Sequence, residues 1–220
     1  MAKKPLFTAA STGWFRLGLL VSVAFLAFAG YAVYAYYHSP WWTNQGWQFG
    51  QPVLFSHRHH AGELRIDCRF CHSTVENSAF AGMPSTQTCL VCHSQIFSQT
   101  AMLRPVIESA ETGRPLHWAR VNWVPDFVYF NHSLHIAKGV GCTTCHGQVG
   151  DFALEEQAHS FDMTWCLNCH RNPAPHLRPR SEIFAARWTP PPDRLEVGRK
   201  LLVAYDIHTA HLTDCVTCHR

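Results

Sequence analysis

The longest apolar stretch of the chain lies near its N-terminus. Residues 17–37 read LGLLVSVAFLAFAGYAVYAYY and include no charged side chain. A helix of this length, at about 1.5 Å per residue, spans about 31 Å, close to the ~30 Å hydrocarbon core of a bilayer. We therefore predict one transmembrane helix over residues 17–37, because no other stretch of the sequence is long and apolar enough to cross a bilayer.

The residues that flank this helix predict its orientation. Lys3, Lys4 and Arg16 precede it, whereas the next Lys or Arg after it is Arg58. Positively charged flanks stay in the cytoplasm, so we predict a cytoplasmic N-terminus, with residues 38–220 outside. Both ends also carry the aromatic side chains expected at membrane–water interfaces: Trp14, Phe15, Tyr34, Tyr36, Tyr37, Trp41 and Trp42.

A cleaved signal peptide is the alternative interpretation of this segment. Ala27-Phe28-Ala29 resembles the small-residue site at which such peptides are cut. The apolar run continues for eight residues beyond Ala29, which favours a retained anchor.

Ten cysteines and sixteen histidines distinguish the rest of the chain. Every cysteine falls in a C-x-x-C-H pentapeptide, and five such motifs leave no cysteine over. The motif is typical of c-type haem attachment, in which the two thiols form thioethers with the porphyrin and the histidine becomes the proximal iron ligand. The five motifs are Cys68–Cys71–His72, Cys89–Cys92–His93, Cys142–Cys145–His146, Cys166–Cys169–His170 and Cys215–Cys218–His219.

Three other uses of paired cysteines fit this pattern less well. Five short disulfide loops would not explain a histidine after each second cysteine. Zinc ribbons use C-x-x-C units in pairs, and five units leave one unpaired. A thioredoxin-like motif needs a surrounding strand–helix pattern, which is missing here. The sequence therefore predicts five covalently bound c-type haems.

Five haems in so short a chain determine the expected fold. About 180 residues lie outside the membrane, or roughly 36 per haem, fewer than the ~50 residues of the smallest self-sufficient domains. We predict a multihaem cytochrome c that is mostly irregular, with short α-helices just after the attachment sites around a shared haem core, plus one N-terminal transmembrane helix. Residues 194–205, after the N-cap candidate Asp193, are expected to form the one longer soluble helix.

The chain also contains an imperfect duplication. Phe55-Ser56-His57-x-x-His60 precedes Cys68, and Phe130-Asn131-His132-x-x-His135 precedes Cys142 in the same way. We divide the chain into a membrane anchor with its juxtamembrane segment (1–50), a two-haem unit (51–100), a linker (101–128), a second two-haem unit (129–180) and a fifth-haem unit (181–220).

The remaining histidines supply candidates for the distal iron ligands. The two imidazoles of an H-x-x-H cannot both serve one iron, because its other axial position belongs to the C-x-x-C-H histidine, so each pair is expected to ligate two different haems. We predict His57, His60, His132 and His135 as distal ligands, followed by His208 and His211 shortly before Cys215. Alternatives that stay open are His59, His117, His159, His176, Met83 and Met163.

Charge and ligation limit the function. The net charge of +3, without a basic tract, gives no support for nucleic-acid binding. Arginine outnumbers lysine strongly, which suits the carboxylates of haem propionates. If all five irons have two axial ligands, no position is free for a substrate, so the chain is expected to carry electrons; whether it also has an enzymatic site stays open.

Longer runs around these motifs resemble known families. Residues 55–72 (FSHRHHAGELRIDCRFCH) and 128–147 (VYFNHSLHIAKGVGCTTCHG) are similar to the class III and cytochrome-c7-type multihaem cytochromes. Together with MTWCLNCHRNP (163–173), LTDCVTCHR (212–220) and the single anchor, the whole chain resembles the pentahaem subunit of bacterial alternative complex III.

This resemblance implies a function and a set of partners. Such complexes sit in the bacterial inner membrane, oxidise menaquinol and reduce a soluble periplasmic acceptor, with polytopic quinol-binding subunits, an iron–sulfur subunit and a monohaem cytochrome c as partners. It also implies that His57 ligates the haem of His72 and His132 that of His146, while His60 and His135 reach haems elsewhere. The alternative is a membrane-anchored quinol dehydrogenase of the NapC/NrfH type that feeds a periplasmic reductase.

Overall fold

The computed structural model describes residues 9–219, which belong to two compact units, Met1–Thr43 and Asn44–Arg220. In the first unit, α1 (Ala9–Tyr37) is followed by the short α2 (Pro40–Thr43). The predicted transmembrane helix is therefore present, and it begins eight residues earlier than the apolar run. Within the described residues it is the one helix that is long and apolar enough to cross a membrane.

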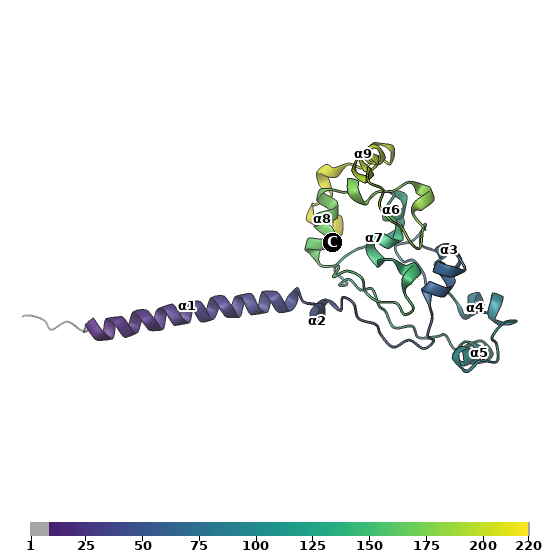
Figure 1. Ribbon diagram of the computed structural model, residues 1–220, viewed down its shortest axis with the longest axis horizontal. Coiled ribbons are helices and arrows are strands. Elements are labelled where there is room, and N and C mark those ends of the chain that lie inside the picture. Colours follow the sequence, from purple (N-terminus) through teal and green to yellow (C-terminus); the bar gives the residue numbers. More distant parts are fainter. Residues whose placement is uncertain (1–8, 220) are drawn as a thin grey trace, which may run out of the picture. The chain divides into compact units, whose positions relative to one another are not determined.

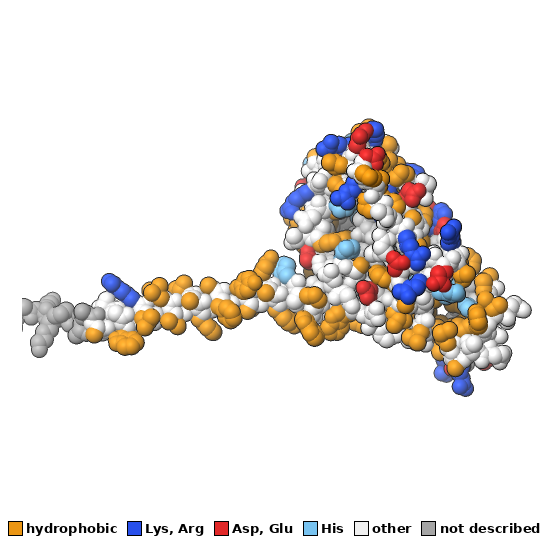
Figure 2. Space-filling view, viewed as in Figure 1, with side chains coloured by type: hydrophobic (Ala, Val, Ile, Leu, Met, Phe, Trp, Pro, Cys, Tyr) orange, Lys and Arg blue, Asp and Glu red, His pale blue; other side chains and the backbone are white. Residues whose placement is uncertain are grey.

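Apolar side chains cover α1 on all sides and remain exposed. Trp14 is 74% exposed, Phe28 is 68% exposed and Val33 is 56% exposed, and Figure 2 shows apolar side chains along the whole length of the helix. A helix that is hydrophobic all round is typical of a membrane span. At its C-terminal end, the rings of Tyr37 and Trp42 pack edge to face at 4.5 Å. These features are compatible with a single-pass anchor.

The second unit consists of short helices joined by irregular segments, and no strand occurs among the residues that the structure describes (Figure 1). Isolated bridges join Gln45 to Gln157, Gln48 to Glu156 and Val140 to Leu177. The α-helices are α3 (Cys68–Cys71), α4 (Thr86–His93), α5 (Arg104–Thr112), α6 (His132–Ala137), α7 (Cys142–His146), α8 (Met163–Arg171), α9 (Arg194–Ala204) and α10 (Cys215–Cys218). A π-helical turn, η1, covers Arg58–Glu63, and 3₁₀ turns cover Ala101–Leu103, Val149–Asp151, Ala174–His176, Arg180–Glu182 and Thr209–His211.

The sparse, helical and irregular architecture predicted from the sequence is confirmed, with one difference in placement. The short helices coincide with the attachment motifs instead of following them. Asp67 and Asp162 explain why, because each accepts a hydrogen bond from a backbone N–H of the next turn and so starts a helix at or just before the cysteines. The predicted longer helix is α9, which begins directly after Asp193, although that side chain makes no capping bond.

The buried apolar core is small. One cluster contains Val53, Leu103 and Val106, and the other contains Val75, Ile136 and Ile183. Each cluster borders an attachment motif, since Cys89 packs against the first and Cys142 against the second. Within the residues described, large apolar side chains beside the cysteines stay exposed, among them Phe70 at 48%, Val91 at 65% and Val216 at 75%.

Candidate functional site

The two cysteines of each C-x-x-C-H motif lie in one turn of helix. We number the motifs first to fifth in chain order; they lie in α3, α4, α7, α8 and α10. One helical turn brings cysteines three residues apart to the same side. No disulfide joins any of the ten cysteines, all of which lie within the described residues. Both thiols of every motif are therefore available for attachment to a cofactor.

Most of the motif histidines have their Nδ1 atom fixed by a backbone carbonyl. Because a carbonyl only accepts, Nδ1 must carry the proton, and the lone pair of Nε2 is left free for a metal. This is the arrangement that metal-binding histidines usually adopt. The four bonds run from His72 to Gly82 at 2.7 Å, from His93 to Ile96 at 3.2 Å, from His170 to Leu212 at 2.7 Å and from His219 to Phe127 at 3.1 Å.

Three of the predicted distal ligands show the same arrangement. The Nδ1 atoms of His60, His132 and His135 donate to the carbonyls of Ser56 at 2.9 Å, Ala79 at 2.8 Å and Asn131 at 2.8 Å, respectively. Their Nε2 atoms are therefore also free to bind a metal.

These three imidazoles each lie opposite the imidazole of a motif. With metal–nitrogen bonds of about 2 Å on each side, two axial imidazoles place their ring centroids roughly 6 Å apart. The centroid distances are 6.1 Å for His60 and His93, 6.3 Å for His132 and His146, and 6.2 Å for His135 and His170. The residues of the second, third and fourth motifs thus fit an iron between two histidines.

Burial favours the neutral, metal-binding form of these side chains. It lowers the pKa of His146 to about 4, and it also lowers the pKa of His60, His72 and His135. At neutral pH these imidazoles therefore carry no charge, as a metal ligand requires.

His57 has a different partner from the other predicted ligands. Its Nδ1 lies 3.1 Å from the Oε2 atom of Glu155. The side chain is close enough to His72 and His146 for their charges to interact. The structure thus places His57 near the histidines of the first and third motifs and in contact with Glu155.

The other predicted ligands point elsewhere. His208 Nε2 lies 2.9 Å from Asp206 Oδ1, and His211 Nδ1 lies 2.8 Å from Asp214 Oδ2, with both imidazoles strongly exposed. Of the open alternatives, His59 contacts Glu63, His159 stacks on Trp165, His176 lines a cavity, and His117, Met83 and Met163 are exposed.

The five motifs follow one another in space in an order that differs from their order in the chain. The thiols of Cys68 and Cys142 lie close enough to shift each other's pKa, which places the first motif beside the third. Electrostatic contacts join Cys71 to Cys89, Cys145 to Cys166 and Cys169, and Cys166 to Cys218. The spatial order is second, first, third, fourth, fifth, and α4, α3, α7 and α8 follow this course in Figure 1.

Comparison with known proteins agrees with these observations. The chain is 36% identical over 156 residues to the multiheme cytochrome c subunit of menaquinone reductase from Nitratidesulfovibrio vulgaris, an alignment that covers 60% of this chain and 74% of that subunit. The chain belongs to the multihaem cytochrome c family. No family model matches its sequence. As a multihaem cytochrome c, it is a c-type haem protein.

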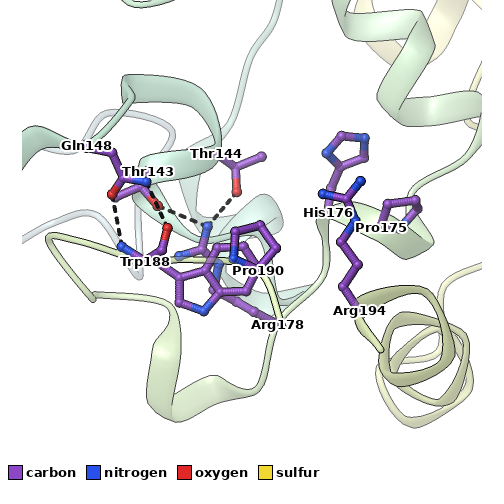
Figure 3. A pocket seen from close by; sticks show the side chains of 9 residues that line it. All are labelled: Thr143, Thr144, Gln148, Pro175, His176, Arg178, Trp188, Pro190 and Arg194. Carbon is purple, nitrogen blue, oxygen red and sulfur yellow. Dashed lines mark hydrogen bonds between the residues drawn. The ribbon is translucent and has the colours of Figure 1, made fainter. Parts of the chain in front are cut away.

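A buried arginine supports the third motif of this multihaem cytochrome c. Arg178 is 1% exposed, donates to the hydroxyls of Thr143 at 3.1 Å and Thr144 at 2.8 Å, and lies over the Trp188 ring at 4.0 Å (Figure 3). Together with Thr143 and Thr144, it lines a cavity of about 420 Å³. Its guanidinium fixes the turn that carries Cys142 and Cys145, while its buried Nε makes no hydrogen bond to any described residue.

Two functional features of this multihaem cytochrome c were missed by sequence reasoning. Glu155 has no motif around it, and only the tertiary fold brings it to His57. The carbonyls of Gly82, Ala79 and Leu212, which fix the histidine tautomers, belong to backbone that any residue supplies. The capping aspartates Asp67 and Asp162, in contrast, stand in the sequence at the position where a helix start is expected.

Proposed function

We propose that this chain is the electron-transfer subunit of a membrane complex that oxidises menaquinol and reduces a soluble periplasmic acceptor, and that it carries five c-type haems. The observation that supports this best is the unbroken spatial series of five attachment motifs, with imidazole pairs spaced for an iron at three of them. Haem iron held by two histidines supplies one-electron chemistry without a free position for substrate.

In this proposal the two H-x-x-H pairs connect neighbouring motifs. His57 serves the first motif and His60 the second, while His132 serves the third and His135 the fourth. The contact between Cys68 and Cys142 then joins the two halves. Each H-x-x-H holds two cofactors at a fixed separation, which accounts for the organisation of five cofactors by so few residues.

We further propose that α1 anchors the subunit in the inner membrane, with the N-terminus in the cytoplasm and the haem-binding unit in the periplasm. Polytopic quinol-binding subunits, an iron–sulfur subunit and a monohaem cytochrome c are the proposed partners. The relative from N. vulgaris supports such an assembly, because it is itself named as a subunit of a menaquinone reductase.

The relative's name also supports a second candidate, in which electrons flow toward menaquinone. That protein is a menaquinone reductase subunit, so its complex is named for the opposite direction. A chain of bound redox centres conducts both ways, and the potentials of the centres and partners set the direction. Assays of the purified complex with a menaquinol analogue plus oxidised acceptor, and with a menaquinone analogue plus reduced donor, distinguish the two.

The central experiment is purification in mild detergent followed by mass spectrometry of the intact complex and its subunits. We expect this chain to be heavier than its sequence by the mass of five haems and to copurify with polytopic and iron–sulfur subunits. A chain with the mass of its amino acids alone, or without Soret absorbance, would refute the proposal. Copurification with a lone periplasmic reductase would instead support the NapC/NrfH-type alternative.

A further inference from the structure

We infer that Glu155 is a positioning residue that lowers the reduction potential of the haem ligated by His57, and this inference rests on the ligand assignment proposed above. Glu155 contacts the proposed ligand and does not contact the iron itself. Its carboxylate stands where the corresponding ligand of the second half has a neutral backbone carbonyl. The consequence is that the two halves of the duplication hold chemically different redox centres.

His57 and Glu155 are partly buried, and the two atoms through which they meet are shielded from solvent. His57 Nδ1 and Glu155 Oε2 are 3.1 Å apart, with side chains 25% and 17% exposed. Both atoms are shielded from solvent, and neither forms a hydrogen bond with any residue among 9–219, so their 3.1 Å approach is a close contact without hydrogen-bond alignment. Because neither atom has another polar partner at this distance, the carboxylate charge of Glu155 lies directly beside the ring of a proposed iron ligand.

The fold brings these two residues together through the loop that follows the third motif. Arg58 donates its backbone N–H to Phe152 O at 2.8 Å and its Nε to Asp151 O at 2.9 Å. Gly62 approaches Gly150 so closely that a Cβ at Gly62 would overlap the Gly150 carbonyl oxygen. The π-helical turn that follows His57 is therefore docked on residues 149–152, and Glu155 lies three residues beyond that contact.

The second half of the duplication offers an internal comparison. His132 occupies the position that corresponds to His57, and its Nδ1 donates to Ala79 O at 2.8 Å. A carboxylate acceptor makes an imidazole more basic and more anionic than a carbonyl acceptor does. A more anionic axial ligand stabilises ferric over ferrous iron, so the reduction potential falls. The charge of Glu155 also acts on His72 of the first motif and His146 of the third, so the haem of the third motif should shift in the same direction, but less, because Glu155 contacts His57 directly.

The test compares reduction potentials of the full-length holoprotein in detergent, wild type against Glu155→Gln, by spectroelectrochemical titration. Gln keeps the size and an acceptor oxygen but removes the charge, so His57 acquires an environment like that of His132. We expect one of the five haem components to become easier to reduce by a factor of at least about ten, which for a one-electron couple is about 59 mV. The low-spin ferric electron paramagnetic resonance signal of the same haem should change as well.

Two further variants separate this role from a structural one. Glu156→Gln is the matched control, since Glu156 is adjacent and its carboxylate accepts from Gln48 Nε2 at 3.1 Å instead of facing a predicted ligand. We expect Glu156→Gln to leave all potentials unchanged, and Glu155→Asp, which keeps the charge, to retain most of the low potential. An unchanged potential in Glu155→Gln, or an equal shift in Glu156→Gln, overturns the inference.

Haem content decides which proposal has failed. Absorbance of the pyridine complex and intact mass count the haems of each variant before titration. Wild-type protein without five haems contradicts the proposed function and this inference together. Five haems in every variant with no shift in Glu155→Gln overturns only the role of Glu155.

Discussion

The two H-x-x-H units of this cytochrome have nearly the same ring geometry although they lie in different backbone structures. Phe55 meets His57 edge to face at 5.0 Å and stacks on His60 at 4.4 Å. Phe130 meets His132 edge to face at 4.8 Å and stacks on His135 at 4.5 Å. The first unit leads into a π-helical turn, whereas the second starts α6. The ring arrangement is thus maintained by the aromatic–histidine contacts and not by one type of helix.

The environments of the two units differ more than their geometry does. In the first unit, the turn docks on residues 149–152, and His57 meets the carboxylate of Glu155. In the second unit, His132 and Ser133 donate their backbone N–H groups to the carbonyls of Ala79 and Ser78, and His132 Nδ1 also donates to Ala79 O. The duplicated histidine pair therefore keeps its ring geometry while the surrounding loops change its electrostatics. If both pairs ligate haems as proposed, the two units hold centres of different potential.

The largest expected effect comes from removing the second histidine of each unit. His135→Ala should convert the haem of the fourth motif from low-spin to high-spin, and His60→Ala should do the same at the second motif, because each loses one axial ligand. Electron paramagnetic resonance of the ferric holoprotein should show one of five haems high-spin in each variant and two in the double variant.

His208→Ala and His211→Ala serve as controls for this prediction, because their imidazoles contact carboxylates and are exposed. We expect no new high-spin signal from either. A high-spin signal in these controls, or an entirely low-spin spectrum of His135→Ala, would contradict the assignment of ligands to the two units.

The contrast between the units also shows how far the sequence determines the site. The five motifs, the duplicated F-x-H-x-x-H and the exclusion of two imidazoles from one iron all follow from residue types and spacing. The resemblance to the class III cytochromes adds that His60 and His135 reach haems other than those of His72 and His146. Neither the spacing nor the resemblance shows that these haems belong to His93 and His170. Those histidines lie more than thirty residues beyond His60 and His135, and the intervening loops, which have no periodic pattern, determine their positions.

Other parts of the fold show the same division between local and tertiary information. The helices at the first and fourth motifs follow from local signals, since Asp67 and Asp162 cap their starts, whereas the residues before the other three motifs make no capping side-chain bond. The position of the π-helical turn, and with it the contact between Glu155 and His57, depends on the close approach of Gly62 to Gly150. Neither glycine carries a sequence signal for that contact. The boundaries drawn at residues 51–100, 101–128, 129–180 and 181–220 stay predictions, because the structure forms one compact unit from residue 44 onward.

A smaller effect is expected where the chain enters the first motif of each half. Asp67 precedes Cys68 and caps α3, whereas Gly141 precedes Cys142 because the Arg178 guanidinium fills the space of a side chain there. Gly141→Ala should displace Arg178 from Thr143 and Thr144 and lower the free energy of unfolding by about 2–3 kcal/mol. Denaturant unfolding of the detergent-solubilised holoprotein, followed by near-ultraviolet circular dichroism, measures the change.

Gly50→Ala is the matched control for Gly141→Ala, since a Cβ at Gly50 meets no other atom within 4 Å. We expect its effect to stay within about 0.5 kcal/mol, as is usual for an exposed position. Equal destabilisation by both variants would show that Arg178 moves without cost and that the third motif does not depend on it.

The smallest expected effect distinguishes the residues at the start of the two H-x-x-H units. Asn131 Oδ1 accepts from the Ser133 backbone N–H at 2.9 Å, whereas Ser56 Oγ accepts from the His59 N–H at 3.3 Å. Asn131→Ala should therefore lower the free energy of unfolding by about 1 kcal/mol, as loss of a good helix cap does, and Ser56→Ala by about 0.5 kcal/mol. The same denaturant titration applies, because neither variant removes a proposed ligand. If Ser56→Ala costs as much as Asn131→Ala, then the first unit relies on its local cap and not on docking against residues 149–152.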